Sequence, residues 1–375
     1  VDAAGMTDHI DAIDLHLIES PIRSARSHGS GHVKMSVQRV IVRVRTQDGL
    51  AGWGEAAPWA PFGNVAAGTM AVLATTLRPA LLGRDPAAIT ARAADCAAAI
   101  AGHPEAKVAI DMALWDIAGK RAGLPVHALL GGAVRETIPL SFSIANPDFA
   151  ADLERARELF AQGHRILKVK TGYLPHAQDL KRLEALRANL PELDLRVDYN
   201  QGLAPMDAIR TLRDIEAFRP TFIEQPVPRG QEAALAAITA ALDTPVLADE
   251  SVYSPDEMLR AARERLADCV SIKLMKAGGY GPARAIDAIA SAAGMPSYGG
   301  TLWEGGIAAA AGAHLLAALP NCTLGCEFYM PSYALVRDIC PDPLLAGGGV
   351  VRVPQGVGLG VEVDEAELAA LAVAG

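Results

Sequence analysis

The stretch GHRILKVKTGY, residues 163–173, places lysines at positions 168 and 170 inside an apolar run. The isoleucine, leucine and valine around them favour a β-strand, and residues i and i+2 of a strand point to the same face. Two ammonium groups side by side repel each other. We therefore expect Lys168 and Lys170 to face either solvent or a group of carboxylates that compensates their charge.

Short apolar stretches of the same kind recur on both sides of this strand, with helical patterns such as 148–163 and 206–218 between them. The repeat of about 24–30 residues is that of a βα unit. The pattern predicts an α/β fold, a (β/α)7β-type TIM barrel over residues 133–349. The predicted strands are IPLSFSIA (138–145), RILKVK (165–170), LRVDYN (195–200), TFIEQP (221–226), TPVLADES (244–251), DCVSIKLMK (268–276), MPSYGG (295–300) and TLGCEFY (323–329).

The part of the chain before residue 133 has a different pattern. Residues 38–46 alternate as a strand does, and Asp48-Gly49 predicts a hairpin turn into a second strand. Helical periodicity follows, with stretches at 71–83, 89–102 and 106–123. We predict an α+β domain over residues 1–132, to which the C-terminal segment 350–375 returns.

Composition and charge narrow the functional classes. The 375 residues are 51% hydrophobic and 21% charged, and the net charge of −9 gives no support for a nucleic-acid or membrane-surface partner. The N-terminal residues lack a signal-peptide pattern, and no apolar run is long enough for a transmembrane helix. We expect a cytoplasmic protein with five reduced, scattered cysteines, of which Cys322 and Cys326 are buried small residues rather than a metal pair.

Polar residues stand where the predicted strands end. Because the carboxyl ends of barrel strands meet at one mouth, where barrel enzymes keep their active sites, these side chains should converge. From one strand to the next, Lys170, Asp198, Glu224, Asp249 and Lys273 follow at intervals of 24 to 28 residues. The full set is Lys168, Lys170, Asp198, Asn200, Glu224, Asp249, Lys273 and Glu327.

Three of these residues, Asp198, Glu224 and Asp249, would form an all-oxygen cage on adjacent strands. Hard oxygen ligands suit Mg²⁺, with Mn²⁺ as a substitute. A single acidic residue after a strand is more often a helix cap or a solvated loop charge. Three in register at the ends of successive barrel strands favour a metal site.

The lysines lie on either side of this trio in strand order, Lys170 before it and Lys273 after it. A cation next to a substrate carboxylate makes the neighbouring carbon more acidic. A lysine close to a divalent cation and to a second lysine has a depressed pKa and can act as a base near neutral pH. Since Ile272 and Leu274 should face outward to helices, Lys273 should face into the barrel.

At this point the sequence resembles the enolase superfamily, in its muconate lactonizing enzyme subgroup, over essentially the whole chain. The motifs that carry the resemblance are LKVKTG, RVDYNQG, IEQP, LADES, SIKLMKAGG, YGGTLWEGGI and GCEF, preceded by GLAGWGEAAP and AIDMALWDIAGKRAGLPVHALLGG in an N-terminal capping domain. The resemblance implies metal ligands at Asp198, Glu224 and Asp249, an acid/base at Lys170 tuned by Lys168, Lys273 on the other face, and Glu327 at the end of the eighth strand.

The resemblance also implies that the capping-domain loops 22–32 and 55–65 close over a small-molecule carboxylate substrate. Candidate substrate-binding residues are Arg23, Arg26, His28, Trp59 and Phe62 in these loops, and Asn200 in the barrel. The seventh strand end has no histidine, unlike the mandelate racemase branch, and GCEFYMP lacks the Asp-x-Asp of dipeptide epimerases. A homo-oligomer is expected from the family alone.

Several activities remain open on the same residues. The first is a muconate-type cycloisomerase, and the second is a racemase, epimerase or dehydratase of an amino-acid derivative that uses the same two lysines. A Schiff-base aldolase barrel fits three metal-type carboxylates poorly. A non-catalytic metal-binding barrel would leave the lysines without a role.

Overall fold

The computed structural model describes residues 8–33, 35–146, 148–328, 331–341, 344 and 347–373. Eight parallel strands form one sheet in sequence order, β7 to β14. A parallel bridge between Leu140 and Cys326 brings the two ends of this sheet together, which makes it a barrel. The strands are β7 (Ser141–Ile144), β8 (Ile166–Lys170), β9 (Asp194–Asp198), β10 (Ile223–Glu224), β11 (Val246–Ala248), β12 (Cys269–Ile272), β13 (Ser297–Gly300) and β14 (Cys326–Glu327).

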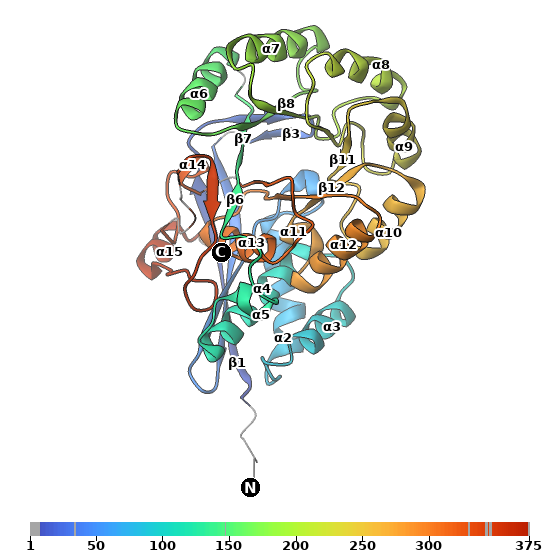
Figure 1. The fold of residues 1–375 in the computed structure, drawn as a ribbon. Coiled ribbons are helices and arrows are strands. Elements are labelled where there is room, and N and C mark those ends of the chain that lie inside the picture. The colour runs from blue at the N-terminus through green and yellow to red at the C-terminus, as the bar shows by residue number, and fades with distance from the viewer. Residues whose placement is uncertain are drawn as a thin grey trace.

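Helices follow the barrel strands and lie outside them, so the predicted (β/α)7β-type barrel is confirmed (Figure 1). Their apolar faces explain the arrangement: α8 buries Ala208, Leu212 and Ile215, one helical turn apart. The helices are α6 (Phe149–Ala161), α7 (His176–Asn189), α8 (Pro205–Glu216), α9 (Glu232–Ala241), α10 (Pro255–Glu264), α11 (Leu274–Ala277), α12 (Tyr280–Ala292) and α13 (Gly306–Ala317).

The N-terminal part contains an antiparallel sheet in the order β1-β4-β5 and a group of helices. The turn at Asp48-Gly49 joins β4 to β5, as the sequence predicts. The strands are β1 (Ile10–Pro21), β4 (Ser36–Thr46) and β5 (Ala51–Ala56), with a small hairpin of β2 (Arg26–His28) and β3 (Gly31–Val33). The helices are η1 (Ala60–Phe62), α1 (Ala66–Val72), η2 (Leu73–Leu77), α2 (Arg78–Leu81), α3 (Ile89–Ala99), α4 (Pro104–Ala122) and α5 (Val126–Leu129).

The C-terminal segment runs back along the molecule. Strand β15 (Val350–Arg352) pairs antiparallel with β6 (Thr137–Pro139), and the short α14 (Pro331–Ala334) precedes it. Helix α15 (Glu365–Leu371) then leads to Ala372, which forms a bridge to Ile18 of β1. The last turns of the chain therefore lie against the N-terminal sheet.

Several strand predictions differ from the structure in detail, and β10 and β11 cover only part of the predicted stretches 221–226 and 244–251. The stretch 138–145 divides into β6 and β7, and the predicted strand 268–276 ends at Ile272 because helix α11 begins at Leu274. The predicted strand 323–329 is reduced to β14, and its last residue lies outside the described residues. The hairpin of β2 and β3 was not predicted from the sequence.

A buried ion-pair network joins the N-terminal sheet to the barrel. The Arg39 guanidinium on β4 lies 2.8 Å from Glu55 on β5 and 2.8 Å from Asp338 of the C-terminal segment. Glu55 also accepts hydrogen bonds from the backbone N–H groups of Gly305 and Ala308 at the start of α13. We call Arg39, Glu55 and Asp338 the interdomain clamp, because it fixes the strand that leads into loop 55–65.

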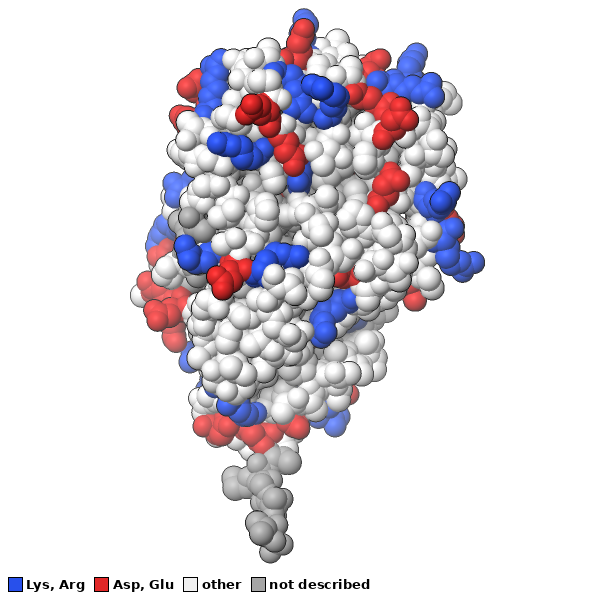
Figure 2. Space-filling model, viewed as in Figure 1, with Lys and Arg blue, Asp and Glu red and all other residues white. Residues whose placement is uncertain are grey.

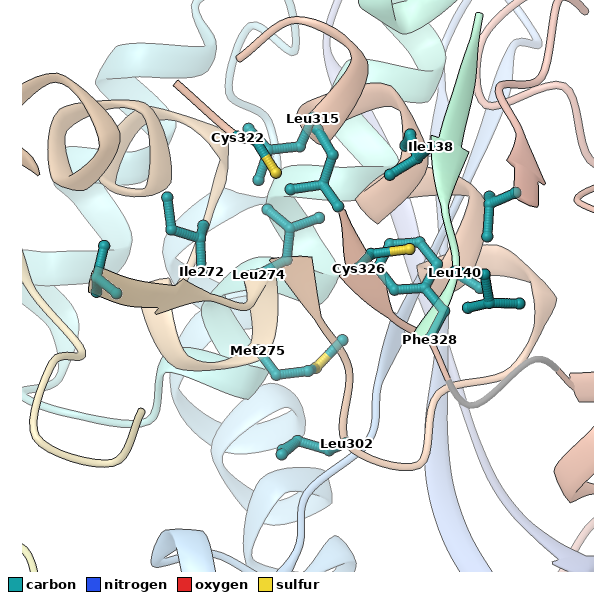
Figure 3. Close-up of a cluster of buried hydrophobic side chains, with 14 of the residues drawn as sticks. Ile138, Leu140, Ile272, Leu274, Met275, Leu302, Leu315, Cys322, Cys326 and Phe328 are labelled. Atoms are coloured by element: carbon teal, nitrogen blue, oxygen red, sulfur yellow. The ribbon is translucent and has the colours of Figure 1, made fainter. Parts of the chain in front are cut away.

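One hydrophobic cluster spans both parts of the chain. It includes Trp53 and Met112 from the N-terminal part and Ile272 and Phe328 from the barrel. Figure 3 shows a portion of this cluster, in which the Cys322 and Cys326 side chains lie among aliphatic and aromatic groups. Both cysteines are buried and free, as are the three other cysteines.

On the face shown in Figure 2, lysines and arginines are mixed with acidic residues and form no continuous basic patch among the described residues. This distribution agrees with the acidic composition. Among the described residues, no helix is both long and apolar enough to span a bilayer.

Candidate active site

The strand-end residues predicted from the sequence converge at the carboxyl ends of the barrel strands. Each side chain is contributed by the last residue of a strand or by the residues next to it, because the parallel register aligns those ends. All are buried, with at most 5% of the surface exposed for Lys168, Lys170, Asp198, Asn200, Glu224, Asp249, Lys273 and Glu327.

Lys168 and Lys170 face a group of carboxylates, which resolves the like-charge pair. The Lys168 ammonium lies 2.7 Å from Glu224 and 3.2 Å from Asp198, and it also pairs with Glu327. The Lys170 ammonium donates to Asp198 at 2.5 Å and lies 3.7 Å from Glu327. Two buried ammonium groups without partners would strongly destabilise the folded protein, and these acids compensate their charge.

The carboxylates that lie together are Asp198, Glu224 and Glu327, whose oxygens are within 4.8 Å of one another. This group shares two members with the trio predicted as metal ligands. The third predicted ligand, Asp249, forms ion pairs at 2.5 Å with Lys273 and at 2.7 Å with Lys276. The ligand set therefore stays a prediction, with Glu327 as the structural alternative to Asp249.

The donor atoms at the barrel mouth fit a hard divalent cation. Among the described residues, Glu224 Oε1 and Glu250 Oε2 are buried and have no hydrogen-bond partner. Buried oxygens without a partner are costly unless something coordinates them. The oxygen-only set is the donor chemistry that Mg²⁺ and Mn²⁺ prefer.

Lys273 enters the site from the end of β12, as predicted, although its neighbour Leu274 begins a helix instead of continuing a strand. Its ammonium donates to Asp249 at 2.5 Å. A side chain at Gly300 on the next strand would come within 2.6 Å of the Lys273 Cε atom, so glycine leaves the space that this lysine occupies.

Lys276 is a site residue that sequence reasoning missed. Its ammonium donates to the backbone oxygens of Asp249 and Ser271, at 2.6 and 2.9 Å, besides its ion pair with the Asp249 carboxylate. The prediction of a strand over 268–276 would point the Lys273 and Lys276 side chains to opposite faces. In the structure Lys273 is the N-cap of helix α11 and Lys276 lies within that helix, and both ammonium groups reach Asp249.

Burial and neighbouring charges shift the pKa values of these groups in opposite directions. Burial alone would lower the pKa of Lys168, but Glu224, Glu327 and Asp198 together raise it well above its ordinary value. Burial also opposes ionisation of Asp198, yet Lys170 and Lys168 hold the pKa of that carboxyl at about 2. The depressed lysine pKa predicted from the sequence depends on a bound cation and stays a prediction.

Glu250 is a buried acid beside the predicted metal ligands. Burial, together with the neighbouring Asp249 and Asp198 carboxylates, raises the pKa of Glu250 to about 8. Its Oε1 atom accepts a weak hydrogen bond from Asn200 Nδ2 at 3.5 Å. Glu250 lies in the predicted strand stretch 244–251 but was not among the predicted site residues.

Both capping-domain loops reach the barrel mouth. In loop 22–32, a side chain at Gly29 would come within 2.0 Å of the Tyr199 carbonyl, so the loop packs directly on the end of β9. His28 is buried beside this contact, and burial together with Lys170 and Arg26 lowers its pKa well below the ordinary value. Arg26 donates to the Ser143 carbonyl at 2.5 Å.

Loop 55–65 contributes an aromatic row above the lysines. Trp59 contacts the His28 ring edge-on at 5.1 Å between centroids and stacks on Phe62 at 5.5 Å. The Lys273 ammonium lies 5.1 Å from the Phe62 ring centroid. Arg23, in contrast, is exposed, so the candidates that line the mouth from these loops are Arg26, His28, Trp59 and Phe62.

Comparison with known families covers both parts of the chain. Residues 13–131 match the mandelate racemase / muconate lactonizing enzyme N-terminal domain, and residues 151–367 match the enolase C-terminal domain-like family.

Two curated relatives show the range of named activities. A chloromuconate cycloisomerase from Cupriavidus necator is 33% identical over 360 residues, which covers 95% of this chain and 96% of the relative. An L-Ala-D/L-Glu epimerase from Bacillus subtilis is 34% identical over 333 residues, which covers 87% and 89%.

Solved structures give the same two classes. A muconate cycloisomerase from Azorhizobium caulinodans is 48% identical, with a TM-score of 0.86, and the match covers 97% of this chain and 98% of that one. An N-succinyl Arg/Lys racemase from Bacillus cereus is 32% identical, with a TM-score of 0.93, and the match covers 98% of each chain.

Proposed function

Because the chain belongs to the mandelate racemase / muconate lactonizing enzyme family of the enolase superfamily, we propose that it is a divalent-cation-dependent cycloisomerase of the muconate type. The relatives named cycloisomerases and those named racemase or epimerase all support an isomerase. The substrate in this proposal is a small unsaturated dicarboxylate, with cis,cis-muconate as the first compound to test.

Asp198, Glu224 and Asp249 would hold the cation, with Glu327 as the alternative third ligand. The cation would supply a positive charge against which negative charge on a substrate carboxylate is stabilised. The buried Glu224 Oε1 atom, which has no hydrogen-bond partner among the described residues, supports this assignment because the cation would coordinate it.

In the proposed reaction, one substrate carboxylate oxygen adds to a carbon of the distant double bond and closes the lactone ring. The electron pair of that double bond moves to the carbon next to the other carboxylate. Lys170 then donates its proton to that carbon, so the product is an isomer of the substrate and nothing leaves. Lys170 regains a proton from solvent when the product departs.

Lys273 stays protonated on the opposite side in this proposal and stabilises developing negative charge without transferring a proton. The observation that carries the proposal is the position of these two ammonium groups. Lys170 lies against Asp198, Lys273 lies against Asp249, and Glu224 is on the strand between those acids.

The second candidate is a racemase or epimerase of an amino-acid derivative such as an N-acylamino acid or a proline derivative. It is favoured by the epimerase and racemase relatives and uses the same two lysines, one removing and one returning the α-proton. The eighth strand ends in Glu327 without an Asp-x-Asp pattern, and the relative of 48% identity is named a muconate cycloisomerase, which favours the first candidate.

Purified protein with Mg²⁺ or Mn²⁺ should abolish the ultraviolet absorbance of cis,cis-muconate, because lactone formation removes the conjugation. We expect Lys170→Met to lower kcat at least 10³-fold and Lys181→Met, at an exposed lysine on α7, to leave it unchanged. The cycloisomerase proposal fails if muconate stays unchanged at high enzyme concentration. If the protein also exchanges the α-proton of an N-acylamino acid in D₂O, the racemase or epimerase takes its place.

A further inference from the structure

A cavity lies beside the candidate active site and is lined by residues of the N-terminal helices α3 and α4 and of the barrel segments α10 to α12. Figure 1 shows where these helices lie. Its volume is about 720 Å³. Cavities of roughly 300–1,000 Å³ are the usual size of small-molecule sites. None of the residues assigned above to metal binding or proton transfer lines it.

The walls of this cavity are mainly apolar. Ile89 and Ala93 of α3 and Ile110 and Leu114 of α4 supply aliphatic surface. The lining also contains the aromatic side chains of Phe62, Trp115 and Tyr253. Flat aromatic ligands gain most from such a wall, since ring–ring contacts add to the burial of apolar area.

The charged groups of the lining include one cation that is compensated only in part. Arg92 pairs with Asp95 at 2.8 Å, and Arg229 pairs with Glu257 at 2.5 Å. Lys107 has no ion pair among the described residues, and burial lowers its pKa.

The nearest acids compensate the Lys107 charge only in part, because Glu105 raises the pKa of Lys107 but forms no ion pair with it among the described residues. Glu105 accepts hydrogen bonds from Asn64 at 3.0 Å and from Thr69 at 3.1 Å. Asp111, one helical turn after Lys107, accepts from the Tyr280 backbone N–H at 2.8 Å, and burial raises the pKa of this carboxyl to about 7. A raised pKa weakens the repulsion that this carboxyl exerts on a nearby anion.

We propose that this cavity is a binding site for an aromatic monocarboxylate, with the ring against Trp115 and the α3–α4 aliphatic wall and the carboxylate on the Lys107 ammonium. The charge complementarity at Lys107 sets the ligand class, and the aromatic lining sets its shape. The site is independent of the proposed reaction at the barrel mouth.

The two sites nevertheless share a wall. Phe62 stacks on Tyr253 at 6.2 Å between centroids, and its ring also faces Lys273. Lys276 lines the cavity and pairs with Asp249. A ligand in the cavity would therefore contact Phe62 and Lys276, which also contact Lys273 and Asp249 of the candidate active site.

The probe for this site is 2-naphthoate, titrated at pH 6.5 by isothermal calorimetry into the full-length protein, with neutral 2-naphthamide as its uncharged match. We expect Lys107→Gln to weaken naphthoate binding at least tenfold and naphthamide to bind the wild type at least tenfold more weakly than naphthoate. Ala97→Trp, at an exposed α3 residue that lines the cavity, should abolish binding by filling the space. Lys181→Gln is the matched surface control and should bind as the wild type does.

Naphthoate could also enter the barrel mouth, so the Lys170→Met variant separates the two sites. Equal affinity in Lys170→Met and wild type supports the cavity. Binding that is lost in Lys170→Met but kept in Lys107→Gln and Ala97→Trp overturns the proposal, as does the absence of binding to the folded wild type at millimolar naphthoate. If size-exclusion chromatography shows an oligomer that Ala97→Trp dissociates, while naphthoate does not bind, the cavity is a contact between copies and the proposal also fails.

Discussion

Lys168 shows how a residue that is unfavourable in its own strand becomes favourable in the barrel. Its ammonium and that of Lys170 share one face of β8, but β9, β10 and β14 each bring a carboxylate to that face. The compensation comes from residues 28 to 159 positions later in the chain. The sequence could therefore predict that a partner group exists, through the regular spacing of strand ends, while the pairing itself required the fold.

The first prediction concerns which carboxylates bind the cation. Mg²⁺ should raise the midpoint of thermal unfolding by a few degrees, since a ligand at 100 times its Kd adds about 2.7 kcal/mol to the free energy of unfolding. Asp198→Asn, Glu224→Gln and Asp249→Asn should each abolish that rise, and Glu327→Gln should keep it. If Glu327→Gln abolishes the rise and Asp249→Asn keeps it, the cation belongs to the group of Asp198, Glu224 and Glu327.

The second prediction follows from Asp111. Its pKa is raised from 3.8 to about 7 by burial, so the unfolded chain loses this proton at lower pH than the folded chain does. The free energy of unfolding should therefore fall as pH rises from about 4 to about 7, by at most about 4 kcal/mol for this group. Asp111→Asn should remove this slope, because an amide oxygen can still accept from the Tyr280 N–H.

Urea unfolding of both proteins at pH 5, 6, 7 and 8 measures this effect. As pH rises, Asp111→Asn should become more stable relative to the wild type, so the free energy of unfolding of the variant minus that of the wild type should increase. Parallel pH curves for the two proteins would show that Asp111 titrates as it does in the unfolded chain.

At the scale of elements, residue type and period predicted most of the barrel. The strands β8 and β9 and the helices α6 and α8 overlap the predicted stretches closely, because each has a clear apolar pattern. Helix α11 was missed because its four residues follow a strand without a turn signal, and both Leu274 and Met275 are buried. The β2–β3 hairpin was missed because its position depends on the contact of Gly29 with the end of β9.

The third prediction is that the interdomain clamp contributes far more to stability than an exposed ion pair on the same strand. Arg39→Met would leave Glu55 and Asp338 buried without their cation, which should lower the free energy of unfolding by about 3–5 kcal/mol. Arg43, on the same strand, pairs with Glu365 at the surface, and Arg43→Met should cost about 0–1 kcal/mol.

Chemical denaturation of the two variants gives this comparison directly. Adding Glu55→Gln to Arg39→Met should recover part of the loss, since it removes one uncompensated charge while an oxygen remains for the Gly305 N–H. Equal effects of Arg39→Met and Arg43→Met would mean that the clamp is solvated and does not hold the sheet to the barrel.

At the scale of the whole molecule, the barrel mouth needs both parts of the chain. The acids and lysines come from the barrel strands, while His28, Trp59 and Phe62 come from the N-terminal part. The sequence pattern predicted the two parts, and the resemblance to the enolase superfamily indicated the loops that face the barrel. It could not predict how they pack together, because that depends on buried contacts such as those of Arg39, which joins segments 299 residues apart.

The final prediction is that both parts unfold together. Ile18, Ile41 and Trp53 of the N-terminal sheet belong to the same buried cluster as barrel residues such as Ile272 and Phe328, so separating the parts would expose apolar surface on each. Urea unfolding followed by tryptophan fluorescence should therefore coincide with unfolding followed by circular dichroism, since three of the four tryptophans, at positions 53, 59 and 115, lie in the N-terminal part. A fluorescence transition at lower urea than the circular dichroism transition would show that the N-terminal part unfolds alone, and the clamp and the shared cluster would then be too weak to couple the two.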